Sequence, residues 1–176
     1  MLQSRTADGT LAAKGSAGMT DTEHKLKVLA DIARELNKEK ITWAIGASLM
    51  LYLRGIVTEF HDIDIMVAEE DAERAEQTIC RIGEELPRRG TAQYKTRWFI
   101  EFTVGGVDVD LMAGFVIVKD GTDHECPLLP EDITETRTVN GESIPLHSAV
   151  RWAEYYRLMG REAKADMVKE WINRAV

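Results

Sequence analysis

The sequence predicts an α/β (α+β) protein in which helices flank a mixed β-sheet and a helical segment follows at the C-terminal end. In the first half of the chain, short apolar runs alternate with stretches of helical hydrophobic spacing. From Trp98 the apolar residues recur at every second position, which is typical of a β-hairpin. Helical spacing returns from about Ser148. This order of elements favours a mixed sheet with helices packed on it.

The composition is that of an ordinary globular protein. The 176 residues suffice for one domain with a sizeable core, and 44% of them are hydrophobic and 30% charged. The net charge is −8, from 22 Lys and Arg against 30 Asp and Glu. This sign argues against a general nucleic-acid binder, although a local basic groove remains compatible with it. Cys80 and Cys126 lie far apart without metal-ligand spacing, so we expect two free thiols.

Three segments are expected along the chain. Residues 1–19 are rich in small residues and show no periodicity, which predicts a disordered tail. Residues 20–146 are predicted to form the folded domain, and residues 147–176 a helical segment that packs on it. No apolar run approaches the roughly 18 residues of a membrane span, and no secretory signal is visible. The expected location is therefore cytoplasmic.

The first helix is predicted to begin at Thr20, because Thr20 and Glu23 fit a capping box and apolar residues follow at helical spacing. Residues 41–45 form a short apolar run, which predicts a buried strand that ends at Gly46. A helical pattern resumes over residues 49–53.

Further strands are predicted downstream. Residues 61–67 are expected to form a strand, and the acidic run 69–71 the start of a helix, since carboxylates are favoured at helix N-termini. Residues 98–104 and 107–112, joined by two glycines, predict a hairpin, and residues 115–118 a further strand.

The last part of the chain is predicted to contain a hairpin and two helices. Asn140-Gly141 lies between two short alternating segments, which indicates a second hairpin. The helical pattern that follows is interrupted near Gly160, so it is expected to form two helices rather than one.

The most informative feature of the sequence is the acidic pair Asp62 and Asp64. On a strand these two side chains point to the same face, because strand side chains alternate. Two adjacent carboxylates repel each other unless a cation lies between them. Such a pair beside buried apolar residues costs stability, and features of that kind tend to mark functional sites.

A later strand carries a second acidic pair, Asp108 and Asp110. If this strand neighbours the first, three or four carboxylates converge. Mg²⁺ prefers oxygen ligands, and two such ions can hold the attacking and leaving oxygens of a phosphoryl displacement. A third carboxylate could orient the nucleophile or accept its proton. We expect Asp110 to take this place because it lies deeper in the strand, while Asp108 remains the alternative.

The turn at Gly46 and Ser48 is the candidate phosphate contact. A glycine lets the backbone approach an anion closely, and Ser48 is expected to open a helix whose first amides favour phosphate. A triphosphate could then lie with one end on this turn and its metal ions on Asp62 and Asp64.

These motifs together resemble the nucleotidyltransferase superfamily of the DNA polymerase β type. The resemblance rests on the stretch Trp43-Ala44-Ile45-Gly46-Ala47-Ser48, then on His61-Asp62-Ile63-Asp64-Ile65, and then on Val109-Asp110-Leu111. Residues 144–146 and 160–166 resemble the end of small bacterial members. Those members include antibiotic nucleotidyltransferases and the enzymes of abortive-infection and toxin–antitoxin systems.

The resemblance implies a nucleotidyltransferase fold and a Mg²⁺-dependent enzyme that transfers a nucleoside monophosphate from an NTP, such as ATP, to an acceptor hydroxyl. Asp62, Asp64 and Asp110 would be catalytic and would hold the metal, with two ions expected. Gly46 and Ser48 would bind the nucleotide.

Several alternatives stay open at this point. The acceptor could be a small molecule such as an aminoglycoside, a tRNA or a protein, and a homodimer or a partner protein is compatible with the sequence. The contrasting hypothesis is a catalytically silent binding module, antitoxin-like or regulatory. His61 either touches phosphate or fills space. Arg161 and Lys164 are either nucleotide or acceptor contacts or a solvated helix end. Trp152, Tyr155 and Tyr156 are expected in the core rather than in a cleft.

Overall fold

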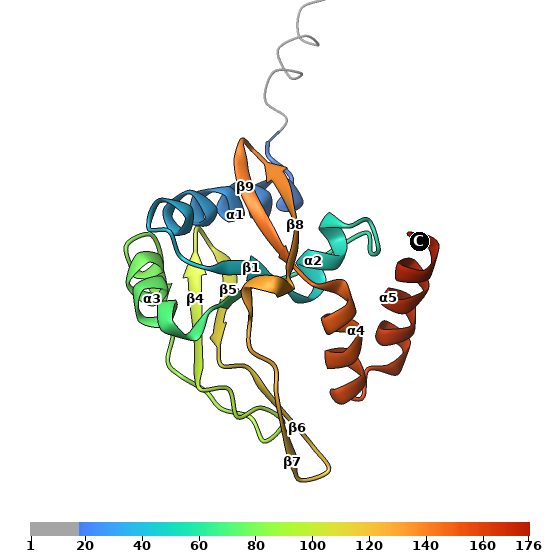
Figure 1. The fold of residues 1–176 in the computed structure, drawn as a ribbon. Helices are drawn as coiled ribbons and strands as arrows, with labels where there is room; N and C mark the ends of the chain where they lie inside the picture. Colours follow the sequence, from blue (N-terminus) through green and yellow to red (C-terminus); the bar gives the residue numbers. More distant parts are fainter. Residues whose placement is uncertain (1–17) are drawn as a thin grey trace, which may run out of the picture.

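A computed structural model describes residues 18–176, and most of the predicted tail therefore lies outside the described residues. The fold combines a seven-stranded mixed sheet with helices on both sides, together with a separate two-stranded hairpin (Figure 1). The helices are α1 (Asp21–Lys38), α2 (Ala47–Leu53), α3 (Ala72–Cys80), α4 (Ala149–Leu158) and α5 (Glu162–Arg174). The strands are β1 (Trp43–Ile45), β2 (Ile63–Val67), β3 (Glu84–Glu85), β4 (Trp98–Val104), β5 (Val107–Ala113), β6 (Val116–Lys119), β7 (Thr122–Glu125), β8 (Ile133–Val139) and β9 (Glu142–His147).

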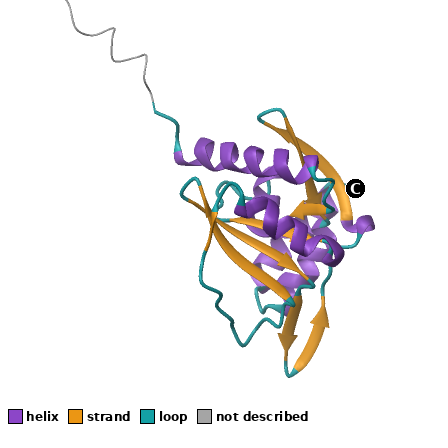
Figure 2. Ribbon diagram, turned by 90° about the vertical axis from the view of Figure 1, so that its left-hand side faces the viewer, coloured by secondary structure: helices purple, strands orange, loops and turns teal. Residues whose placement is uncertain are grey.

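The main sheet has the strand order β3-β4-β5-β2-β1-β9-β8. The pairs β2–β5 and β1–β9 are parallel, and the other neighbouring pairs are antiparallel. Strands β6 and β7 form their own hairpin. This hairpin extends from the end of the molecule opposite α1 (Figures 1 and 2). The mixed sheet confirms the predicted fold class.

Helix α1 begins where the sequence predicts. The hydroxyl of Thr20 accepts a hydrogen bond from the backbone N–H of Glu23 at 3.1 Å, and the Glu23 carboxylate accepts one from the N–H of Thr20 at 2.8 Å. The apolar stripe of the helix, which includes Leu29, Ile32 and Leu36, is fully buried. Burial of this stripe, more than helix propensity, holds α1 on the sheet.

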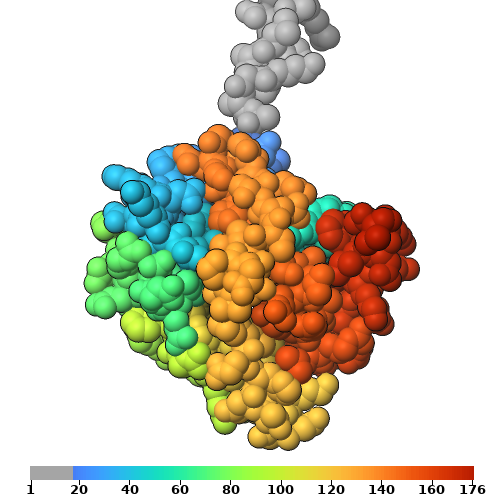
Figure 3. Space-filling model, viewed as in Figure 1, coloured from blue at the N-terminus to red at the C-terminus, as the bar shows by residue number. Residues whose placement is uncertain are grey.

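Helices α4 and α5 lie on the side of the molecule away from α1 and α3 (Figures 1 and 3). The break between them falls at Gly160, whose φ of 78° is in the left-handed region that glycine adopts readily. The two helices pack against each other, and α4 also contacts β6. In residues 18–176, no helix combines the length and apolar character required to cross a membrane.

Strand β2 differs from its prediction in a way that bears on the acidic pair. It begins at Ile63, and Asp62 lies in the bend before it rather than on the strand. Alternation along a strand therefore does not explain how Asp62 is placed, and that part of the sequence argument is wrong. Asp62 nevertheless lines the same cleft as Asp64, because the chain enters the strand beside it.

The other helix and strand boundaries lie close to their predicted positions. Residues 69–71 form a short 3₁₀ turn, and α3 follows from Ala72. Strands β3 and β7 were not expected, because one is only two residues long and the other is largely exposed without apolar alternation. The two cysteines are free thiols, as predicted: Cys80 is exposed and Cys126 buried.

Candidate active site

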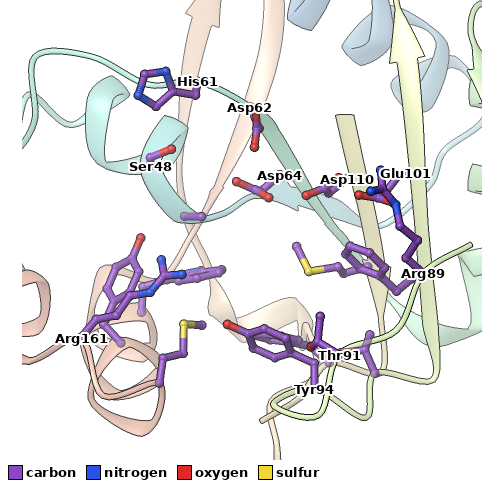
Figure 4. A pocket seen from close by; sticks show the side chains of 18 of the residues that line it. Ser48, His61, Asp62, Asp64, Arg89, Thr91, Tyr94, Glu101, Asp110 and Arg161 are labelled. Carbon is purple, nitrogen blue, oxygen red and sulfur yellow. The ribbon is translucent and has the colours of Figure 1, made fainter. Parts of the chain in front are cut away.

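A cleft of about 660 Å³ opens between the main sheet and the α4–α5 helices (Figure 4). Its walls come from β2, β4 and β5, from the start of α2, from the loop before β4, and from α4 and α5. The cleft contains most of the polar residues that the sequence singled out. These are Ser48, His61, Asp62, Asp64, Asp110, Arg161 and Lys164.

Three carboxylates form a row on neighbouring strands. Asp64 on β2 is the register partner of Asp110 on β5, and Asp110 is the partner of Glu101 on β4. Register partners point to the same face, and adjacent strands lie about 4.8 Å apart, so the three side chains stand side by side. Figure 4 shows them in this row, with Asp62 above Asp64.

Glu101 is a cleft residue that the sequence interpretation missed, although the signal was present. In a hairpin with a two-residue turn, pairing can be counted outward from the turn. Counting from Gly105-Gly106 pairs Val104 with Val107 and places Glu101 opposite Asp110. Asp108, the alternative third acid, is exposed and does not line the cleft.

Two members of the row, Asp64 and Asp110, have no ion-pair partner among the described residues. Burial, followed by the charges of Asp110 and Asp62, raises the pKa of Asp64 to about 8. Burial, followed by the charges of Asp62 and Glu101, raises the pKa of Asp110 to about 6. Asp64 and Asp110 also hydrogen-bond to each other, which favours a proton on Asp64 and a charge on Asp110. A cation placed here would lower both pKa values.

The donor set fits a divalent cation, although no preformed cage exists. Throughout the described part of the chain, no group of three or more His, Cys, Asp or Glu side chains is arranged so that it could hold a metal ion. Mg²⁺ usually takes only one or two protein carboxylates and completes its shell with waters and substrate phosphates. Two adjacent, poorly neutralised carboxylates, Asp64 and Asp110, with Asp62 beside them, are donors of that kind.

The turn before α2 is shaped by packing as well as by the cleft. A Cβ atom on Gly46 would lie 2.4 Å from Cζ2 of Trp152, so only glycine fits against this indole. The N–H of Gly46 donates to the carbonyl of Asp64 at 3.0 Å, which ties the turn to β2. The sequence argument assigned this glycine to close approach of an anion, whereas its Cβ position faces Trp152.

Ala47 and Ser48 are the residues of the turn that line the cleft. Helix α2 begins at Ala47, one residue before its predicted start at Ser48. Ala47 has a φ of 51°, in the left-handed region that is unfavourable for residues with a side chain. Strained backbone of this kind persists where the surrounding structure imposes it, and it concentrates at functional sites.

The wall opposite the carboxylates is cationic. Arg161 and Lys164 line the cleft, and neither forms an ion pair with any residue in the 18–176 range. Arg161 is close enough to lower the pKa of Asp64 by its charge. The ammonium of Lys164 lies 5.3 Å from the ring centroid of Tyr156, and burial lowers its pKa. Both cations line the cleft, and Arg161 is also exposed at the start of α5, so their contact with a nucleotide or an acceptor stays a prediction.

Two aromatic residues serve both the core and the cleft. Trp152 and Tyr156 are only 2% and 1% exposed, as expected of core residues, yet both line the cleft. The indole N–H of Trp152 and the hydroxyl of Tyr156 are buried without a hydrogen-bond partner among the described residues. Buried donors of this kind are rare, and a ligand with acceptor oxygens would satisfy them. Tyr155 belongs to the core alone.

The fold and this site together define a nucleotidyltransferase. The sequence motifs predicted an acidic strand beside a second acidic strand and a glycine turn before a short helix, and the structure has both. The structure adds a cleft whose opposite wall comes from the C-terminal helices. A family model of the aminoglycoside-2''-adenylyltransferases matches residues 28–171. The chain belongs to this family and is an enzyme of the nucleotidyltransferase class, which confirms the predicted superfamily and enzyme type.

Solved structures agree with this assignment. The chain is 30% identical to TM1012 from Thermotoga maritima, provisionally assigned as a nucleotidyltransferase, with a TM-score of 0.65 over 90% of this chain and 98% of that one. The antibiotic-resistance factor ANT(2'')-Ia has a TM-score of 0.56 at 15% identity, over 89% and 94% of the two chains. The lincosamide adenylyltransferase LnuA has a TM-score of 0.55 at 12% identity, over 81% and 95%. The last two likenesses concern the fold alone. A comparison with curated proteins found no match.

Proposed function

We propose that the protein transfers AMP from ATP to a hydroxyl group of a small-molecule acceptor, with an aminoglycoside as the first candidate. The observation that carries this proposal is the opposite charge of the two walls of the cleft. A row of carboxylates with little counter-charge faces two cations without ion-pair partners, Arg161 and Lys164. A nucleoside triphosphate with a divalent cation complements both walls, because its phosphates suit the cations and its metal suits the carboxylates.

In this proposal the triphosphate lies toward the α4–α5 wall. Arg161 and Lys164 neutralise its charge, and the Ser48 hydroxyl donates to a phosphate oxygen. The hydroxyl of Tyr156, which is buried without a partner, supplies a further donor. These groups are held in place before the reaction, so they stabilise the charge that builds up on the departing pyrophosphate without reorganising.

Asp62, Asp64 and Asp110 would hold Mg²⁺. When bound, the metal would neutralise the carboxylates and offset the negative charge of the reacting phosphates. Asp110 would orient the acceptor hydroxyl and accept its proton as the hydroxyl oxygen attacks the α-phosphorus. The bond from the α-phosphorus to the bridging oxygen then breaks, and pyrophosphate leaves. His61 is exposed at the rim of the cleft, where it can contact a phosphate without taking part in proton transfer.

Two arguments favour a small, cationic acceptor over a tRNA or a protein. The net charge of −8 and the acidic wall of the cleft attract amines, whereas a tRNA end calls for a basic groove. ANT(2'')-Ia has been solved with adenylyl-2''-tobramycin and LnuA with lincomycin, so small antibiotics occupy this fold in structurally similar proteins.

The test is calorimetric titration of the four NTPs with Mg²⁺ into the wild type and into the Asp62→Asn/Asp64→Asn variant. We expect Mg²⁺-dependent binding, strongest for ATP, that is lost in the variant. Pyrophosphate release with tobramycin, lincomycin and a panel of related antibiotics then identifies the acceptor. If the wild type binds no NTP, the proposal is wrong, and the contrasting hypothesis of a catalytically silent binding module replaces it.

A further inference from the structure

Glu101 occupies the end of the carboxylate row that lies farthest from Asp64 of β2. Asp110 separates it from Asp64, so it lies two strand spacings, about 10 Å, from β2 across the sheet. It lines the cleft together with Arg89, Thr91 and Tyr94 of the loop that precedes β4 (Figure 4). This end of the cleft faces the loop rather than the cationic wall.

Glu101 is also the one cleft carboxylate that has an ion-pair partner within residues 18–176. Its Oε2 atom lies 3.4 Å from Nε of Arg89, whereas Asp62, Asp64 and Asp110 have no such partner there. The contact lacks hydrogen-bond geometry, and Oε2 is buried without a hydrogen-bond partner among the described residues. A charge-assisted hydrogen bond would be about 2.7–2.9 Å long. The carboxylate is thus neutralised only loosely.

The two partners differ sharply in exposure. The Glu101 side chain is 25% exposed, and that of Arg89 is 77% exposed. An ion pair with one long, solvated side chain contributes little stability. Arg89 can therefore leave at low cost, while Glu101 remains in the cleft on a strand of the central sheet.

The loop that carries Arg89 is anchored on both sides of it. Upstream, the N–H of Leu86 donates to the carbonyl of Glu101 at 2.8 Å. Downstream, Tyr94 forms a β-bridge with Ile117 of β6. Between these anchors the Arg89 side chain can swing away from Glu101 without a change in the sheet.

We propose that Glu101 is a specificity residue that binds a cationic group of the acceptor, and that Arg89 occupies this position in the free enzyme. The proposal rests on the proposed function above, and it assigns one end of the cleft to the nucleotide and the other end to the acceptor. The nucleotide phosphates take the end with Arg161 and Lys164. The acceptor takes the end with Glu101, where an ammonium group displaces the Arg89 guanidinium.

This arrangement selects acceptors by charge. A neutral acceptor gains nothing by displacing Arg89, and an anionic one would meet the carboxylate of Glu101. An ammonium group replaces a loose contact with a direct, charge-assisted hydrogen bond to a partly buried carboxylate. Specificity then arises from exclusion of the wrong acceptors as well as from attraction of the right one.

The test measures equilibrium binding of tobramycin, as a polycationic probe, to the full-length protein and to single variants. In Arg89→Gln the internal competitor is removed, so we expect binding about threefold to fivefold tighter. In Glu101→Gln we expect binding at least about tenfold weaker. The matched controls are Arg88→Gln, next to Arg89 in sequence, and Glu84→Gln on β3, which pairs with β4; neither residue lines the cleft. Both controls should bind like the wild type.

The double variant Arg89→Gln/Glu101→Gln separates this role from a structural one. If Arg89 acts only by occupying Glu101, the double variant binds tobramycin as weakly as Glu101→Gln alone. Equal binding by Arg89→Gln and Arg88→Gln would overturn the proposal, as would an unchanged affinity in Glu101→Gln. If the wild type binds too weakly to measure, binding that becomes measurable in Arg89→Gln supports the proposal, and its absence there overturns it.

Binding of ATP with Mg²⁺ is measured in the same variants. Retained nucleotide binding shows that each variant is folded and that the nucleotide half of the proposed function holds. If Glu101→Gln loses tobramycin binding but still binds ATP, the loss is due to the missing carboxylate of Glu101 and not to misfolding or to a failure of nucleotide binding. Absence of ATP binding in the wild type would instead contradict the proposed function.

Discussion

Asp64 and Asp110 are held where a negative charge is unfavourable for the folded protein. Both lie in register on adjacent parallel strands, partly buried, with Asp62 and Glu101 nearby. Burial and the neighbouring charges raise the pKa of both carboxyl groups, which favours a proton on Asp64 when no cation is present. Residues that oppose stability at one point of an otherwise consistent fold are expected at functional sites.

Replacing Asp64 with Asn should therefore abolish nucleotidyl transfer and stabilise the metal-free protein. With a pKa near 8 in the folded state and about 4 in the unfolded chain, Asp64 binds its proton more tightly when folded. The wild type should lose stability as the pH rises from about 4 to about 8. At pH 7 the variant should be more stable by roughly 1–4 kcal/mol. Denaturant unfolding in the presence of EDTA measures this difference.

Adding Mg²⁺ to the same samples provides the control. The cation should stabilise the wild type and leave the Asn variant nearly unchanged, because the variant has lost a ligand. If the variant kept full turnover, the assignment of Asp64 to the reaction would be wrong. A variant less stable than the wild type at pH 8 would contradict the charge argument.

A second prediction at this scale concerns the packing of Gly46 against Trp152. In Gly46→Ala the new methyl group would meet the Trp152 indole at 2.4 Å, so the turn or α4 must shift. Overpacking of this kind typically costs about 1–3 kcal/mol, and we expect a loss of thermal stability together with reduced ATP binding. Gly18→Ala, where a Cβ would meet nothing within 4 Å, is the matched control for thermal unfolding. Equal melting temperatures of the two variants would refute the packing role.

At the scale of elements, the end of β9 carries a buried histidine. His147 is fully buried and its ring packs against those of Trp152 and Tyr155, which also contact each other. Both ring nitrogens lack a hydrogen-bond partner among the described residues. Burial lowers the pKa of His147 to about 4, despite the opposing charge of Asp132. The junction between β9 and α4 therefore holds a neutral imidazole.

This histidine should make the fold acid-sensitive. The unfolded chain binds a proton near pH 6.5 and the folded chain only near pH 4, so stability is lost as the pH falls between these values. The slope is at most about 1.4 kcal/mol per pH unit. In His147→Gln this part of the pH dependence should disappear, as measured by urea unfolding at a series of pH values. His124→Gln, on the β6–β7 hairpin, should keep it, and an unchanged profile in His147→Gln would exclude the histidine as the cause.

The whole molecule brings two distant parts of the chain together around the cleft. The sheet supplies the carboxylates, and the α4–α5 helices supply the cations (Figure 4). Arg54, just after α2, holds the two parts in place. Its buried guanidinium pairs with Glu135 of β8, donates to Thr134 at 3.1 Å, and lies 6.0 Å from the ring centroid of Trp171 in α5.

The prediction at this scale concerns the cationic wall. Arg161→Gln should weaken ATP binding by at least about tenfold, because a charge-assisted contact to a phosphate contributes about 1.5–3 kcal/mol, and folding should be unaffected. The loss should shrink at high salt. Lys169→Gln, an exposed change on the same α5 helix, is the control in the calorimetric titration. If both variants bind ATP equally, the phosphates do not lie on this wall.

The sequence by itself determined the features that depend on neighbours along the chain. The capping box of α1, the two-glycine hairpin and the break at Gly160 follow from local backbone chemistry, and the structure has each of them at its predicted place. The hairpin register also places Glu101 opposite Asp110, so this site residue could have been counted from the turn. The choice of Asp110 over Asp108 followed from depth in the strand and agrees with the lining of the cleft.

Only the tertiary structure decided the features that depend on contacts between distant segments. The parallel pairing of β2 with β5 sets Asp64 beside Asp110, and no local signal specifies which strands pair across such a connection. The reason for Gly46 lies in Trp152, more than a hundred residues away. Arg161 and Lys164 become cleft residues because α4 and α5 fold back toward the sheet. Burial, which sets the pKa values of the carboxylates, exists only once these segments have packed together.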